Sequence, residues 1–200
     1  MRVFLRLAAF ALVAAFLPCH AVADTNGVPV SRPFGAPAPY GESRHPGNDF
    51  DVPKGTPIIA AADGVVKKIK TPCPGEPYCG GLYLQINHVD GPSGKKLFIA
   101  LYAHLQKVLV NKHEAVKRGQ LIGLSGSSNN GYAHLHFGLI QPGGRGILHS
   151  ETYDPADYWL NGKPQCYDPT KDYAEIGANK LTHPVACAGH AETLLEKGGN

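Results

Sequence analysis

Short strand-like runs separated by turns make up most of the chain before residue 154, and no long stretch there shows helical periodicity. Residues 82–89 alternate apolar and polar side chains, as a half-buried strand does. Similar runs occupy residues 56–62, 65–70, 97–105, 108–110, 121–125 and 134–140. With 24 glycines and 17 prolines among 200 residues, this pattern predicts an all-β, antiparallel domain rather than a helical bundle.

Composition divides the chain into four segments. Residues 1–23 are a leader, 24–44 a Pro-, Gly- and Ser-rich linker and domain edge, 45–149 the β domain, and 150–200 a C-terminal extension. Within the β domain, Asp63-Gly64 separates two of the strand-like runs. An Asp-Gly pair in that setting is typical of a tight hairpin turn, so we expect the two runs to pair with each other.

The leader has the features of an export signal. Two arginines precede an apolar stretch, residues 7–17, that is too short to span a bilayer comfortably, and residues 21–23 give an Ala-x-Ala cleavage pattern. Lipid attachment at Cys19 is the alternative, but the residues just before it fit that signal poorly. We therefore expect a mature chain that begins at Asp24, is periplasmic or secreted, and has no stable insertion in a membrane.

The charge of the mature chain is nearly balanced. Two of the 19 basic residues lie in the leader, which leaves 17 against 16 acidic residues when histidine is uncharged. No basic patch alternates with aromatic residues, so nucleic acid is not expected as a partner.

Four cysteines follow the leader: Cys73, Cys79, Cys166 and Cys187. In an exported chain they suggest two disulfides, although the sequence leaves three pairings open. Cys73 and Cys79 bracket a turn-rich insert, so a local bridge between them is natural, and Cys166 with Cys187 would close a loop of about twenty residues. A cysteine zinc site is the competing interpretation, but the spacings resemble no zinc ribbon or finger.

His134 and His136 lie two residues apart in a strand-like run and therefore project from one face. An isolated pair of this kind is more often exposed or structural than metal-binding. Two other segments supply partners, however: His45 and Asp49 in His-Pro-Gly-Asn-Asp, and His104 in Tyr-Ala-His-Leu. Together the three segments favour a site built from imidazoles and a carboxylate.

In this order the motifs resemble those of the lysostaphin/LytM-type zinc metallopeptidases, which cut peptidoglycan. The likeness covers roughly residues 31–141. It includes Arg-Pro-Phe-Gly at 32–35, His-x-x-x-Asp at 45–49, Tyr-Ala-His-Leu at 102–105, Val-Lys-Arg-Gly-Gln at 116–120 and His-Leu-His-Phe at 134–137. The chain departs from the family pattern at the insert between Cys73 and Cys79 and at Gly138, where an acidic residue is common. These differences bear on the choice of substrate more than on the chemistry.

The resemblance implies that His45, Asp49 and His136 bind one zinc ion, while His104 and His134 act as catalytic residues. The chemistry agrees with this division, because a catalytic zinc takes three protein ligands and keeps one position open for water. The sequence has no His-Glu-x-x-His motif that would supply a glutamate base, and imidazoles titrate in the range needed to move the protons. Which of the two catalytic histidines is the base does not follow from the sequence.

The function implied by the resemblance is that of a zinc-dependent endopeptidase that hydrolyses amide bonds in peptidoglycan stem or cross-bridge peptides, with a D,D-endopeptidase favoured. The groove holding the zinc site is expected to be open. Two alternatives remain: a non-catalytic module of the same fold that binds the wall or activates an amidase, and a secreted bacteriolysin.

Residues outside these motifs are expected to be structural or solvated, namely His88, His113, His149, His183 and His190. Of these, His88 has the best prospect of lying near the site. Asp51 is either a partner behind the ligands or a strand-edge carboxylate. In the extension, Asp154-Pro155 has the features of a helix start and residues 191–197 suggest a short helix. The extension is expected to be a disulfide-clamped appendage or, alternatively, part of a groove wall.

Overall fold

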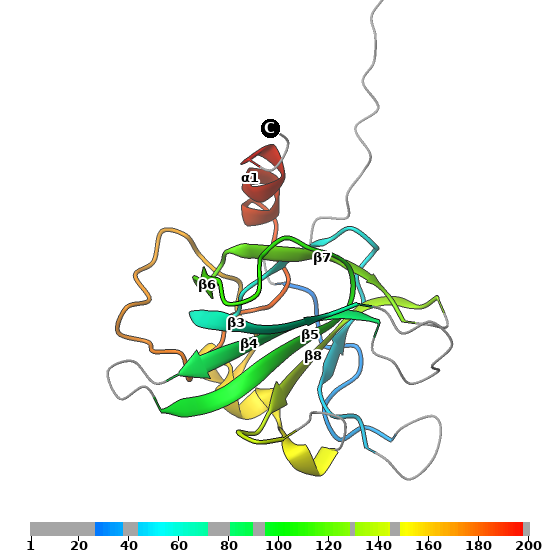
Figure 1. Ribbon diagram of the computed structural model, residues 1–200. Coiled ribbons are helices and arrows are strands. Elements are labelled where there is room, and N and C mark those ends of the chain that lie inside the picture. Colours follow the sequence, from blue (N-terminus) through cyan, green and yellow to red (C-terminus); the bar gives the residue numbers. More distant parts are fainter. Residues whose placement is uncertain are drawn as a thin grey trace, which may run out of the picture.

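The structure, a computed structural model, describes residues 27–37, 44–71, 81–89, 95–128, 131–144 and 149–197 (Figure 1). These residues fold into a mostly antiparallel β-sheet with few helices, which confirms the predicted fold class. The expected export signal and the insert between Cys73 and Cys79 lie outside the described residues.

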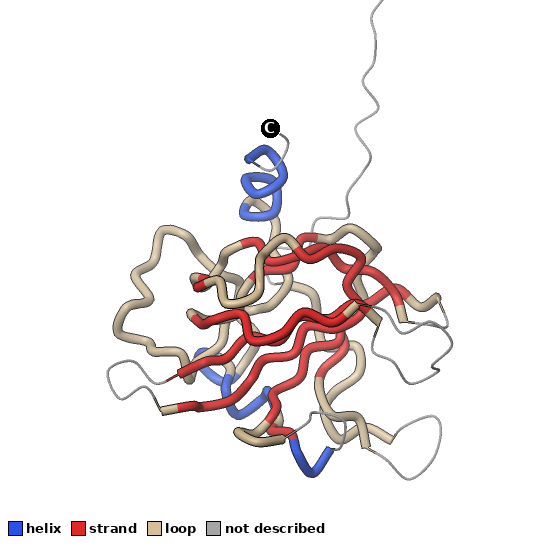
Figure 2. Tube along the Cα trace, in the orientation of Figure 1, coloured by secondary structure: helices blue, strands red, loops and turns tan. Residues whose placement is uncertain are grey.

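The described residues form nine strands joined in one sheet: β1 (Asn48–Phe50), β2 (Pro57–Ile59), β3 (Gly64–Lys70), β4 (Leu82–Val89), β5 (Lys96–Val108), β6 (Ala115–Val116), β7 (Leu121–Ser127), β8 (Ala133–Ile140) and β9 (Thr152–Tyr153). The strand order is β1-β8-β7-β5-β4-β3-β6, with β2 added to β7 and β9 to β8. Figure 2 shows how strand predominates over helix in the chain.

The long strand β5 organises this sheet. It pairs with β4 along most of its length, with β8 in its first part and with β7 near its end. The sequence suggested two separate runs here, but β7 pairs with Leu105, Lys107 and Val108 and so continues the strand. Phe98, Ala100 and Tyr102 alternate along β5 and belong to the main buried core.

The predicted hairpin at Asp63-Gly64 is wrong. β2 pairs with β7, whereas β3 pairs with β4 and β6. The reason is that the chain between them is held by another segment: the backbone of Ala60 exchanges hydrogen bonds with Gly119 N and Gln120 O, at 2.8 and 2.9 Å. The Asp63 carboxylate also accepts a hydrogen bond from the backbone N–H of Arg118, at 2.8 Å. A tertiary contact thus replaces the local strand pairing.

The helices of the described chain are short and lie in the extension or at its start: η1 (His149–Glu151), η2 (Pro155–Tyr158), η3 (Leu160–Gly162) and α1 (His190–Lys197). The predicted helix start is confirmed, since the Asp154 side chain caps η2 by accepting from Ala156 N, although η2 is a 3-10 helix. No described helix combines the length and the apolar composition that crossing a membrane requires.

The extension packs against the β domain. A disulfide joins Cys166 to Cys187. Just before it, the chain runs along β2: Ile59 N donates to the Pro184 carbonyl at 2.9 Å, and Ala186 N donates to the Pro57 carbonyl at 3.1 Å. The Arg118 guanidinium also donates to the carbonyls of Gly177 and Lys180, at 3.0 and 2.8 Å. The extension therefore forms an isolated antiparallel bridge with β2, between Val185 and Ile58.

Candidate metal centre

The ladder between β1 and β8 brings the predicted ligands together. Asp49 lies directly opposite His136, and opposite residues in an antiparallel pair project from the same face. On its other side, the backbone of Asp49 accepts from Ser31 N at 2.9 Å and donates to the Arg32 carbonyl at 2.8 Å. The carboxylate is therefore carried by a backbone that is held from both sides.

His45 reaches the same place from the turn before β1. Its ring meets that of His136 edge-on, with centroids 4.9 Å apart. Gly47 makes this approach possible, because a Cβ there would lie 2.5 Å from the Phe137 carbonyl oxygen and 2.9 Å from the His136 ring. A side chain at this position would push the turn away from β8.

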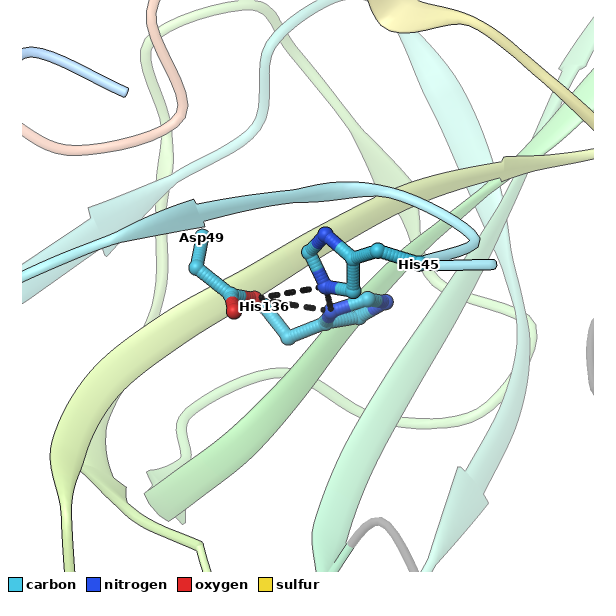
Figure 3. Close-up of side chains that lie close together, drawn as sticks. All are labelled: His45, Asp49 and His136. Carbon is cyan, nitrogen blue, oxygen red and sulfur yellow. Dashed lines mark hydrogen bonds and ion pairs between the residues drawn. The ribbon is translucent and has the colours of Figure 1, made fainter. Parts of the chain in front are cut away.

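The three predicted ligands present converging atoms, as Figure 3 shows. Oδ1 of Asp49 lies 2.9 Å from Nδ1 of His136 and 3.1 Å from Nε2 of His45, and the two nitrogens are 3.0 Å apart. All three residues are buried. Within the described part of the chain, this is the only group of three or more histidine, cysteine or acidic side chains placed closely enough to hold a metal ion.

The hydrogen bonding around these atoms fits a cation between them. Nδ1 of His45 lies 3.1 Å from the Pro33 carbonyl oxygen, which only accepts, so Nδ1 carries the hydrogen and Nε2 of the neutral ring is a bare acceptor. When both rings are neutral, at most one of the three converging atoms carries a hydrogen. A single divalent cation would satisfy all three, and metal-ligating histidines typically donate their other N–H to such a carbonyl.

The electrostatics keep the predicted ligands in the forms that bind metal. Burial raises the pKa of Asp49, but its contacts with His136 and His45 outweigh this effect and hold that pKa well below its ordinary value. Burial lowers the pKa of His136, although the neighbouring Asp49 carboxylate opposes the shift. An ionised carboxylate beside a neutral imidazole is the state that a divalent metal requires.

His104 reaches the site through an unusual backbone conformation. In a regular strand its side chain would project opposite to that of Ala103, which pairs with His136. Instead φ at His104 is 61°, in the left-handed region, at the point where β5 passes from β8 to β7. Its ring consequently lies 4.5 Å from that of His134 and 6.2 Å from that of His136, between centroids.

Burial also shapes the chemistry of His104. Its Nδ1 is buried and has no hydrogen-bond partner among the described residues. Burial, with the nearby rings of His136 and His134 adding to it, lowers the pKa of His104 to about 3. The ring is therefore neutral at physiological pH, and none of the described groups holds it through Nδ1.

His134 is oriented by its own loop. Its Nδ1 lies 3.1 Å from the Tyr132 carbonyl oxygen, so the hydrogen of the neutral ring is on Nδ1 and Nε2 is a bare acceptor. That Nε2 lies 3.8 Å from Oδ1 of Asp49, farther than the ring nitrogens of His45 and His136. His134 thus lies beside the three predicted ligands and is not one of the converging group.

These side chains line an open cleft of about 540 Å³. All five site residues predicted from the sequence border it, together with Ser31, Arg32, Asp51, Ser128 and Tyr132. None of the described residues beyond 150 lines it, so the extension is an appendage and not a wall of this cleft.

The segment that carries the cleft residues from His45 to His136 also matches a known protein family. The sequence profile of peptidase family M23 matches residues 43–151, which is more than half of the chain. The chain belongs to this family. The M23 region contains all five residues of the predicted site and ends close to the start of the extension.

The relatives of this M23 domain agree with the assignment. Peptidoglycan DD-endopeptidase ShyA of Vibrio cholerae is 40% identical over 100 residues, which are 50% of this chain and 21% of that protein. Among solved structures, LytU is 32% identical with a TM-score of 0.50, covering 66% of this chain and 83% of that one. The catalytic domain of lysostaphin from Staphylococcus simulans is 29% identical with a TM-score of 0.51, covering 64% and 89%. The match spans only about a fifth of the length of ShyA.

The structure also adds residues that the sequence analysis of the M23 domain missed. Ser31, Arg32, Ser128 and Tyr132 border the cleft. Two of them had a sequence signal: Arg32 begins the Arg-Pro-Phe-Gly motif, and Tyr132 precedes His134 by two positions in an extended segment. Asp51 lies on the cleft edge, where the Ser31 hydroxyl donates both to it and to the Asp49 carbonyl. It is therefore linked to the backbone behind a proposed ligand.

The other histidines take structural or exposed positions. His88 is fully buried, with Nδ1 2.7 Å from the Asp63 carbonyl oxygen, and does not line the cleft. His183 is buried as well, and its Nε2 lies 2.7 Å from the Val28 carbonyl oxygen. His190 approaches the Gly119 carbonyl at 2.9 Å, His113 is exposed in a turn, and His149 begins η1.

Proposed function

We propose that this protein is a zinc-dependent endopeptidase that hydrolyses amide bonds in the peptides of peptidoglycan. The observation that carries the proposal is the convergence of His45, Asp49 and His136 beside two further histidines in the cleft of an M23 domain. The names of the Vibrio cholerae relatives ShyA and ShyC, both peptidoglycan DD-endopeptidases, support a D,D-endopeptidase in particular.

The proposed zinc ligands are Nε2 of His45, Oδ1 of Asp49 and Nδ1 of His136. Two imidazoles and one carboxylate make a donor set that suits zinc and leaves a coordination position open. Zinc bound there supplies Lewis acidity and lowers the pKa of a bound water. The role of the surrounding chain is to keep the ligand atoms converging, through the β1–β8 ladder and the Pro33 carbonyl.

His134 is the proposed general base. A base must be unprotonated and within reach of the proton that it accepts. The hydrogen bond to the Tyr132 carbonyl leaves Nε2 of His134 as the bare nitrogen, and that nitrogen lies 3.8 Å from Oδ1 of Asp49. It is therefore close to the proposed ligands and able to accept a proton from a water attacking the substrate.

His104 is the proposed donor to the oxyanion. Its buried Nδ1 has no acceptor in the described part of the chain, and buried N–H groups without acceptors are rare, so the hydrogen of the neutral ring belongs on Nε2. A donor placed where negative charge develops stabilises the transition state. Burial keeps the His104 ring neutral, so its Nε2–H is present at physiological pH and can donate to the oxyanion without the ring first taking up a proton.

A periplasmic or secreted location belongs to the same proposal. The disulfide between Cys166 and Cys187 supports it, because disulfides persist in oxidising compartments. The Ala-x-Ala pattern at residues 21–23 supports it from the sequence side.

Digestion of purified peptidoglycan tests the proposed function. We expect the zinc-loaded protein to release peptides with new termini at cross-links, identified by mass spectrometry, and to leave the glycan strands intact. The matched control is His136→Ala, which should release none because it removes a ligand. Binding to peptidoglycan without any new terminus, by protein that carries a full complement of zinc, would show a binding module instead.

A further inference from the structure

Tyr132 is an exposed aromatic residue at the cleft. Among the described residues, the large apolar side chains that stay exposed are Val65, Val89, Leu109 and Tyr132, at 41%, 37%, 39% and 49%. Tyr132 is the most exposed of them and the one that lines the cleft. Aromatic surface left uncovered beside a site is a common point of contact for a ligand.

The backbone of Tyr132 is held firmly. Its carbonyl oxygen accepts from Ser128 N at 3.0 Å and from the Ser128 hydroxyl at 3.2 Å, and it also faces Nδ1 of His134. Gly131, just before it, has a φ of 85° and donates its N–H to the Ser128 carbonyl at 2.9 Å. This tight turn, which needs the left-handed conformation that glycine adopts freely, aims the tyrosine at the cleft.

The far end of the side chain is held as well. The Tyr132 hydroxyl donates to the Asp51 carboxylate and lies beside the Ser31 hydroxyl. The Ser31 hydroxyl donates to Asp51 too, and to the Asp49 carbonyl at 3.1 Å. Tyr132 lies just before β8 and Asp51 just after β1, and these two strands pair with each other, so the side chain reaches from one strand of the pair toward the other.

The ring lies next to a proposed catalytic residue. Its centroid is 4.8 Å from that of His134, and the two planes are inclined by 34°. When the scissile bond of a substrate lies beside Nε2 of His134, the adjoining part of the substrate can therefore contact the exposed Tyr132 ring. Since both ends are tethered, binding against this ring would cost little conformational entropy.

We propose that Tyr132 is a preorganised aromatic platform that binds the peptide residue adjoining the bond to be cut, through aliphatic C–H groups packed on the ring. The inference rests on the proposed function and adds a specificity-determining residue to it. The competing role, a clamp that only orients His134, predicts a different kinetic result. Loss of a platform weakens substrate binding, whereas loss of a clamp slows turnover.

Kinetics on a soluble cross-linked peptidoglycan peptide dimer separate the two roles. We expect Tyr132→Ala to raise KM about tenfold and to change kcat less than about threefold, the loss of one aromatic contact. Tyr132→Phe keeps the ring and should hold KM within about threefold of the wild-type value. In the zinc-loaded His104→Ala background, calorimetric titration with the same dimer should show the same tenfold weakening for Tyr132→Ala, independently of turnover.

Tyr83→Ala is the matched control. This tyrosine on β4 is covered by Lys68 and Lys70 and does not line the cleft, so its loss should leave KM and affinity unchanged. Unchanged KM and affinity in Tyr132→Ala, or a fall in kcat alone, would overturn the platform while leaving the endopeptidase intact. A wild-type protein that neither binds nor cleaves the dimer would instead overturn the proposed function, and the platform with it.

Discussion

Asp49 and His136 face each other across the β1–β8 ladder, 87 residues apart in the sequence, with Oδ1 and Nδ1 separated by 2.9 Å. This register decides the site, because a shift by one residue would turn His136 to the other face of the sheet. The same face carries His134, whose Nε2 is 3.8 Å from Asp49 Oδ1. Two histidines of one strand thus occupy different positions relative to one carboxylate.

Because the two histidines lie differently relative to Asp49, replacing His136 should remove the zinc, whereas replacing His134 should reduce turnover and leave the zinc bound. His136→Ala removes a proposed ligand, so the protein should purify without zinc and without activity. His134→Ala leaves the three ligands in place and should retain close to one zinc per chain. Its turnover should fall about 10²–10⁴-fold, the usual contribution of a positioned acid or base. The measurement is zinc per chain by atomic emission, beside turnover on peptidoglycan.

Asp49→Ala is the control for the ligand class and should behave like His136→Ala. Loss of zinc from His134→Ala together with its retention in His136→Ala would reverse the assignment. Full activity in both histidine variants would place the site elsewhere.

Because His104 has a left-handed backbone, two substitutions there should reduce turnover equally but differ in their effect on stability. Both His104→Gly and His104→Ala lack the imidazole, so turnover should fall about 10²–10⁴-fold in each. Only glycine adopts the φ of 61° without strain, and the left-handed conformation costs other residues about 1 kcal/mol or more. The free energy of unfolding should therefore be higher for His104→Gly than for His104→Ala by about 1 kcal/mol. Equal values from urea denaturation would contradict this role of the backbone.

Removing the disulfide in the extension should lower the stability of the protein but leave the proposed zinc site intact. Cys166 and Cys187 are 21 residues apart, and a closed loop of this size is worth about 3 kcal/mol in the chain-entropy estimate. The variant with both cysteines replaced by serine should unfold at lower denaturant and be cut sooner by proteases beyond residue 150. Since no described residue of the extension lines the cleft, zinc content should be unchanged in the folded variant. A marked loss of zinc would show that the extension supports the site.

Intact mass with and without reduction tests the cysteines that lie outside the described residues. The bridge between Cys73 and Cys79 stays a prediction. Protein from its native compartment should show two disulfides, and four freely alkylated thiols would refute both bridges.

Buried His88 predicts a pH dependence of stability. Burial lowers the pKa of His88 to about 4, while the unfolded chain has the ordinary value of 6.5. Below pH 6.5 the unfolded state therefore binds more protons, and stability falls until the pH reaches the folded pKa. From linkage, His88 alone should cost about 2 kcal/mol between pH 7 and pH 5.

His88→Asn is the matched variant for this prediction, because its amide does not titrate and offers a donor to the Asp63 carbonyl that Nδ1 now faces. Urea denaturation of both proteins at pH 7 and pH 5 gives the comparison. The wild type should lose about 2 kcal/mol more than His88→Asn over this interval. An identical loss would mean that His88 is not the group responsible.

Local pattern was sufficient for much of the fold. The alternation in residues 82–89 and 134–140 predicted β4 and β8, and the Asp154-Pro155 pair predicted the start of η2. These predictions succeed because side-chain period and capping are properties of a few consecutive residues. The pairing after Asp63-Gly64 failed for the opposite reason, since β2 pairs with a strand more than sixty residues away.

For the site, the sequence alone determined that His134 and His136 share a face, because a two-residue spacing in a strand permits nothing else. The tertiary structure decided which atoms meet. The β1–β8 register places Asp49 opposite His136, the left-handed backbone at His104 turns the ring of that residue into the cleft, and Tyr132 meets Asp51 of the neighbouring strand segment. These arrangements depend on contacts between segments distant in the chain, and no local spacing encodes such contacts.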